Sequence, residues 1–118
     1  MKFLLDTNIC IYARVRCRHR FRHSVTAAEL AFGVAKSRSA KNRVALETFL
    51  LPLNVAPFDL AAAFAYGELR AELEHRGQPI GPLDLKIAAH AISLGTILIT
   101  NNEREFRRVP SLKVQNWA

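Results

Sequence analysis

The chain has 118 residues, half of them apolar, and a formal net charge of +7 from 17 Lys and Arg against 10 Asp and Glu. This length predicts a single domain over residues 1–118 with one hydrophobic core, and the composition excludes a disordered chain. The basic balance favours a polyanion such as nucleic acid as a partner, although charge that serves only solubility would give the same count.

The N-terminal segment predicts a buried strand that ends in polar residues. Residues 2–5 form a short apolar run, and Asp6, Thr7 and Asn8 then predict a turn into a helix that begins at residues 9–13. This segment is too short and too polar for a signal peptide or a membrane span. We therefore expect a protein without a membrane association.

Residues 14–23 interrupt this pattern with five arginines and two histidines in ten positions. Neither a buried helix nor a buried strand has such a composition. Strict alternation would place the arginines on one side, as in an edge strand or an exposed arm. We expect one of these two structures, an edge strand or an exposed arm. The sequence therefore does not decide whether the sheet has a second strand here.

The middle of the chain predicts two helices and a strand. Thr26 is followed three residues later by Glu29, which is the signature of a capping box and predicts a helix that starts near Thr26. A second helix is expected over residues 40–51 and a strand over residues 53–58.

The C-terminal half alternates helices with strands. A long helix over residues 59–76 begins with Asp as its cap and is followed by Gly, and a helix over residues 82–94 begins with Pro. Residues 96–100 predict a central strand, residues 102–106 a short helix, and residues 112–114 a last strand. This order predicts an α/β fold with a parallel twisted sheet of four or five strands flanked by helices.

Three carboxylates are expected at one rim of this sheet. Asp6 follows the first strand, and Glu29 and Asp84 lie near helix starts, while ligands of such sheets bind at the carboxyl ends of the strands. Carboxylates placed close together repel unless a cation or a raised pKa compensates, and magnesium suits oxygen ligands. Each acid also has a purely structural explanation as a helix cap or as a partner of the helix dipole.

Asp84 fits its structural explanation least well. It is aligned with an apolar stripe of its helix, whereas Lys86 and His90 fall outside that stripe. A carboxylate directed toward a core costs free energy unless a charge pairs with it, and a metal ion would remove that cost. The stripe consists of Ile87, Ala88, Ala91 and Ile92.

The residues that bind zinc are scattered. The two cysteines have no zinc-binding spacing, which favours a reduced cytoplasmic protein, and no histidine pair completes a site. We expect His90 to be a packed or partly exposed helix residue. The residues concerned are Cys10, Cys17, His19, His23, His75 and His90.

Four motifs in this order resemble the PIN domains of VapC-type toxins, and most closely the subgroup that cleaves initiator tRNA. They cover nearly the whole chain except residues 14–23, and their combination is specific although each alone is weak. The motifs are DTN at 6–8, TxxEL at 26–30, IGPxDxxIAAHA at 80–91 and TNNxxEF at 100–106.

The resemblance implies a three-layer PIN-like fold and a metal-dependent endoribonuclease of a type II toxin–antitoxin system. It implies Mg²⁺ or Mn²⁺ as the cofactor, a tRNA substrate, a cognate antitoxin and a homodimer. It places the catalytic residues at Asp6, Glu29, Asp84 and Asn102, the direct metal ligands at Asp6 and Asp84, and bordering polar residues at Thr7, Asn8 and Thr100.

The interval between Asp6 and Glu29 is shorter than in the relatives that the chain resembles. The basic segment within it is either an arm that contacts RNA or the scar of a deletion, and its small apolar surface favours the scar. A degenerate PIN domain that binds antitoxin or RNA without cleavage is therefore the alternative. A phosphoacceptor domain is disfavoured, because no acidic pair follows the first strand. The candidate RNA contacts are Arg14, Arg16, Arg18, Arg20 and Arg22.

Overall fold

The structure is a computed structural model that describes residues 3–6, 20–50 and 54–116. For residues 20–27, 49, 50, 54 and 55 only the backbone is described. The helix predicted to begin at residues 9–13 lies outside the described residues.

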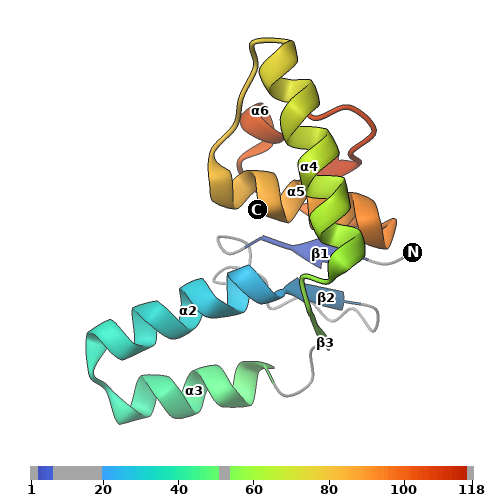
Figure 1. Ribbon diagram of the computed structural model, residues 1–118. Helices are drawn as coiled ribbons and strands as arrows, with labels where there is room; N and C mark the ends of the chain where they lie inside the picture. The colour runs from blue at the N-terminus through green and yellow to red at the C-terminus, as the bar shows by residue number, and fades with distance from the viewer. Residues whose placement is uncertain (1–2, 7–19, 51–53, 117–118) are drawn as a thin grey trace.

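A five-stranded sheet forms the centre of the molecule (Figure 1). Every strand pair in it is parallel, and the order is β3-β2-β1-β4-β5, so the first strand of the chain lies in the middle. The predicted parallel α/β sheet is therefore confirmed, with five strands. The strands are β1 Phe3–Leu5, β2 Arg20–His23, β3 Asn54–Ala56, β4 Ile97–Ile99 and β5 Val114–Gln115.

Strand β2 lies inside the sheet, so the prediction of an edge strand or an exposed arm is wrong for residues 20–23. It pairs with β1 on one side and with β3 on the other. Backbone hydrogen bonds on both edges hold it in place whatever its side chains are. The basic composition that suggested an edge was therefore a poor guide to its position.

Five helices surround the sheet in the described part of the chain. Helix α2 begins two residues before the predicted start at Thr26, so Thr26 lies inside the helix and Glu29 falls in its second turn. The prediction of a helix that starts near Thr26 is therefore confirmed, although Thr26 is not its cap. The helices are α2 Ser24–Ser37, α3 Ala40–Leu50, α4 Leu60–His75, α5 Pro82–Leu94 and α6 Glu103–Phe106.

The predicted boundaries of α4 and α5 are confirmed by their caps. The Asp59 carboxylate accepts a hydrogen bond of 3.0 Å from the backbone N–H of Ala62, which satisfies one free donor at the start of α4. Pro82 opens α5, where its missing N–H costs nothing. Gly95 closes α5 at a φ of 64°, a conformation that favours glycine.

Side chains of alternate strand residues face two different helical layers. Leu4 and Leu98 pack with α4 and α5 in the larger part of the core. Leu5 and its neighbours on β4 face the opposite side, where Leu30 of α2 packs against them. The sheet is thus covered on both faces, as the three-layer prediction requires.

Helix α5 is buried around most of its circumference. Of the two states expected for His90, packed or partly exposed, the packed one is confirmed, because its side chain is fully buried and its ring meets that of Phe58 edge to face at 5.6 Å between centroids. Burial lowers the pKa of this imidazole. None of the helices in the described ranges is long and apolar enough to cross a membrane.

Candidate functional site

Asp6 and Thr100 follow two neighbouring strands and lie side by side. Leu5 of β1 is in register with Ile99 of β4, so the next residue of each strand meets the other at the carboxyl edge of the sheet. The Thr100 hydroxyl donates a hydrogen bond of 2.8 Å to the Asp6 carboxylate, and both side chains are buried. The predicted position of Asp6 and Thr100 at this rim is confirmed.

A second carboxylate pair lies at the start of α5. Asp84 in its first turn forms a side-chain hydrogen bond with Glu105 of α6. The backbone N–H of Gly81 donates a hydrogen bond of 2.8 Å to Glu105 Oε1. A Cβ built on Gly81 would stand 3.7 Å from Glu105 Oε1 and 4.0 Å from Asp84 Oδ2, so both carboxylates flank this glycine.

The surroundings of the two carboxyl groups favour one proton shared between them. Burial raises the pKa of Asp84 to about 7, and the hydrogen bond and charge of Glu105 and the charge of Asp6 add to this shift. The N–H of Gly81 and the hydrogen bond from Asp84 lower the pKa of Glu105. The opposite directions of the two shifts favour the proton on Asp84 rather than on Glu105.

Asn102 connects the two pairs. Its backbone N–H donates to the Thr100 hydroxyl at 3.0 Å, and its side-chain amide donates to Glu105 Oε2 at 3.1 Å. Asn102, predicted as a catalytic residue, thus lies beside Glu105, and its catalytic role stays a prediction. We call the connected set the carboxylate network, and it consists of Asp6, Asp84, Thr100, Asn102 and Glu105.

Glu29 is not brought into the carboxylate network. It is exposed on α2, and no hydrogen bond or ion pair joins it to the network's acids in the part of the chain that the structure describes. Its catalytic role remains a prediction. Outside the described residues, or without a described side chain, are Thr7, Asn8, Arg14, Arg16, Arg18, Arg20 and Arg22.

Glu105 was missed by the sequence analysis as a site residue. Its signal was present, because the motif TNNxxEF contains it three residues after Asn102. Only the fold shows that α6 turns this side chain back toward the start of α5. Periodicity gives no such information for a helix of four residues.

The network has the chemistry of a magnesium site but not a ready-made one. In the described ranges, no group of three or more Asp, Glu, His or Cys is arranged to hold a metal ion as it stands. Magnesium binds one or two carboxylates directly and keeps several waters, which the Asp84–Glu105 pair and nearby Asp6 satisfy. A cation bound there would offset the burial, and to a smaller extent the negative charges of Glu105 and Asp6, that raise the pKa of Asp84.

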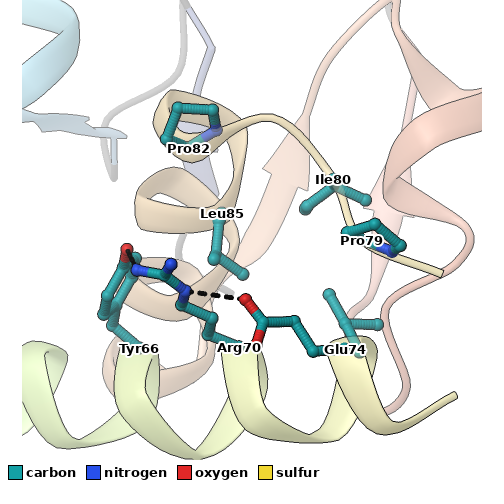
Figure 2. A pocket seen from close by; sticks show the side chains of 8 residues that line it. Tyr66, Arg70, Glu74, Pro79, Ile80, Pro82 and Leu85 are labelled. Carbon is teal, nitrogen blue, oxygen red and sulfur yellow. Dashed lines mark hydrogen bonds and ion pairs between the residues drawn. The ribbon is translucent and has the colours of Figure 1, made fainter. Parts of the chain in front are cut away.

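A pocket of about 250 Å³ adjoins the network (Figure 2). Its lining combines aliphatic side chains with an Arg70–Glu74 ion pair of 3.0 Å on α4. No member of the network lines it, although residues on both sides of Gly81 do. The lining residues are Tyr66, Arg70, Leu73, Glu74, Pro79, Ile80, Pro82 and Leu85.

Known proteins resemble this chain over its full length. The family model for the PIN domain matches residues 3–112. A tRNA(fMet)-specific endonuclease VapC from Shigella flexneri is 43% identical over an alignment of 131 residues, which covers 100% of this chain and 99% of that protein.

Solved structures agree with this likeness. The VapBC2 structure from Rickettsia felis, bound to a DNA fragment from its promoter, has a chain that matches with a TM-score of 0.88 and 38% identity, with both chains fully covered. A DNA-bound VapBC structure from Salmonella typhimurium gives a TM-score of 0.89 and 35% identity, covering 100% of this chain and 99% of that one.

These comparisons also concern the prediction that the interval between Asp6 and Glu29 is shorter than in the relatives. The alignment with the Shigella protein spans 131 residues, whereas this chain has 118. Some 13 positions of the alignment therefore have no counterpart in this chain. The sheet of this chain nonetheless contains five strands.

Proposed function

The chain belongs to the PIN-domain family, among the VapC ribonucleases, and from that premise we propose that its carboxylate network is the active site of a toxin endoribonuclease. The observation that carries the proposal is the convergence of Asp6, Asp84 and Glu105 at the carboxyl edge of a parallel sheet. Three separate segments of the chain supply these acids. A purely structural cap would not require two carboxyl groups to share a proton.

The carboxylates would serve as the ligands and orienting groups of a divalent cation. Asp6 and Asp84 would hold Mg²⁺, or Mn²⁺ in its place, with Glu105 beside them. When bound, such an ion polarises a phosphodiester oxygen and lowers the pKa of a bound water. No side-chain nucleophile is then needed for hydrolysis of the phosphodiester bond.

The polar residues of the network keep the acids in place. The Thr100 hydroxyl fixes one oxygen of Asp6, and the Asn102 amide and the Gly81 N–H each fix one oxygen of Glu105. The hydrogen bonds from Gly81 and Asn102 favour the ionised form of Glu105, which is the form that binds a cation. Lone pairs not used by these donors remain for a metal ion or a water molecule.

The substrate and partners follow from the relatives. Since a 43% identical protein is named a tRNA(fMet)-specific endonuclease, we propose that this chain cleaves tRNA in the cytoplasm. VapBC complexes among the similar structures support a cognate antitoxin as its partner. We also propose a homodimer, because Leu60 and Phe64 lie one turn apart on α4 and are 70% and 66% exposed.

The alternative function, a PIN domain that binds antitoxin or RNA without cleavage, has less support than the sequence suggested. It was suggested by the expected loss of the strand before Glu29, and β2 is present with partners on both sides. What remains in its favour is the exposed position of Glu29. Activity measurements on the acids therefore separate the two functions.

The experiment is cleavage of a purified tRNA pool with Mg²⁺ and, in parallel, with chelator. We expect cleavage only with Mg²⁺, and we expect Asp84→Asn to lower it by a factor of about 10³ or more, since loss of a charged ligand removes the cation that stabilises developing charge. Glu105→Gln should lower it strongly as well. Glu29→Gln in the same series measures what the exposed acid contributes.

Thermal unfolding of each variant without metal is the control that tests whether the variant still folds. Asn in place of Asp84 carries no charge to desolvate and can still donate a hydrogen bond to Glu105, so this variant should be at least as stable as the wild type. Equal cleavage by the wild type and Asp84→Asn, or cleavage that persists in chelator, would overturn the proposal. Tight tRNA binding by the wild type without any cleavage would instead favour the non-catalytic alternative.

A further inference from the structure

Arg108 lies on the same side of the α6 region as Glu105. The two residues are three positions apart, and the backbone N–H of Arg108 donates to the Glu105 carbonyl at 3.2 Å, so the turn continues through them. Residues with this spacing in a helical turn have side chains that point in neighbouring directions. The guanidinium of Arg108 therefore leaves the helix near the carboxylate of Glu105.

Both side chains also contact one short segment before α5. Glu105 accepts from the N–H of Gly81, and Nη1 of Arg108 reaches the carbonyl oxygen of Pro79 at 3.5 Å. Pro79 and Gly81 are two residues apart, a reach of at most about 7 Å along the chain. The positive charge of Arg108 also contributes to the lowered pKa of Glu105, which agrees with this closeness.

Arg108 forms no ion pair within the described part of the chain. No carboxylate there lies within ion-pair distance of it, and the residue is exposed. The one hydrogen bond at 3.5 Å is weak and leaves most of the five N–H donors available. By contrast, Glu residues four positions away pair with Arg43, Arg70, Arg76 and Arg107.

We propose that Arg108 binds a backbone phosphate of the RNA substrate next to the phosphodiester that is cleaved. This inference rests on the proposed function and deepens it, because it names how the substrate strand is held beside the acids. A cluster of carboxylates repels a polyanion, so a cation at its rim is needed to bring the strand close. A guanidinium is suited to this role because its planar donors match phosphate oxygens.

The experiment measures tRNA binding to the full chain in chelator, where no cleavage interferes, over a series of KCl concentrations. Arg108→Gln should lower the slope of log affinity against log salt by about 0.7–0.9, the value for one lost phosphate contact, and weaken binding about three- to tenfold. Arg43→Gln on α3 is the matched control, because it removes the same charge far from the network; it should leave both values unchanged.

Cleavage kinetics give the second readout. Arg108→Gln should raise KM by a similar factor with kcat nearly unchanged, while Arg108→Lys should keep the salt slope because the charge is retained. A slope and KM equal to those of the wild type would overturn the assignment. A lower kcat with unchanged binding would also overturn it, since that is the effect of a disturbed Glu105. Failure of the wild type to cleave is a separate result that concerns only the proposed function.

Discussion

The α4–α5 body and the α2–α3 hairpin of this molecule are built in opposite ways. In the body, helices α4 and α5 pack against each other and the sheet, and Leu69, Leu73 and Ala88 are buried. The hairpin extends away from the sheet (Figure 1) and leaves Phe32 and Val44 66% and 61% exposed. A pocket between its two helices remains open to solvent.

The carboxylate network belongs to the body side of this division. Its acids come from the ends of β1, α5 and α6, all of which contact the larger core or the strands beneath it. Glu29 is the one predicted acid on the hairpin. The difference teaches that the acids joined by hydrogen bonds lie on the tightly packed body, whereas Glu29, which has no such bond to them among the described residues, lies exposed on the hairpin.

The largest contrast is expected for two phenylalanines. Phe106 is fully buried in the body, and Phe32 is exposed on the hairpin. Phe106→Ala should lower the free energy of unfolding by about 3–5 kcal/mol, because a cavity and lost burial add, whereas Phe32→Ala should change it by about 0.5 kcal/mol or less. Urea unfolding followed by circular dichroism measures both. Similar losses for the two variants would show that the hairpin is packed in solution.

A smaller effect is expected in how the free energy of unfolding depends on pH, because the body contributes to this dependence and the hairpin does not. Since the pKa of Asp84 is raised to about 7, the folded chain binds more protons than the unfolded chain between about pH 4 and pH 7. The free energy of unfolding without metal should therefore fall as pH rises through this window, by about 1–2 kcal/mol once the half-exposed position of the carboxyl is discounted.

Thermal unfolding in chelator at several pH values measures this slope, and Asp84→Asn should flatten it. Glu47→Gln on the hairpin is the control, because its exposed carboxylate pairs only with Arg43 on the same helix. An identical slope for the wild type and Asp84→Asn would contradict a shared proton in the network.

The smallest expected effects concern two helix caps. Asp59 caps α4 in the body, and the Ser39 hydroxyl accepts a hydrogen bond of 3.2 Å from the N–H of Asn42 at the start of α3. Asp59→Ala should lower global stability by about 1 kcal/mol. Ser39→Ala should instead lower the hydrogen-exchange protection of α3 with little global change, because the hairpin opens locally. A global loss equal to that of Asp59→Ala would show that the hairpin unfolds with the body.

The sequence was informative where local rules decide the structure. The caps of α4 and α5 and the apolar strands β1 and β4 follow from single residues and short patterns, and all four were predicted. Asp6 and Thr100 were placed at one rim because strand ends share an edge in a parallel sheet. These predictions needed no information about distant contacts.

The remaining features depend on tertiary contacts. Strand β2 is interior because its backbone pairs on both edges, a fact that its arginines conceal. Glu105 reaches Asp84 because α6 folds back onto the segment at Gly81, which no periodicity reports. His90 is buried because α5 has neighbours on several sides rather than one. Pattern analysis assumes a single buried face, and that assumption fails for a central helix.

The alignment of β1 with β4 has a consequence for when activity appears. Asp6 meets Thr100 only because Leu5 is paired with Ile99, and a slip by one residue would turn the Asp6 side chain to the other face of the sheet. Correct strand alignment and a working set of acids thus arise in the same event. A copy of the chain with misaligned strands would therefore lack the Asp6–Thr100 pair and, under the proposed function, would not cleave RNA until it refolds.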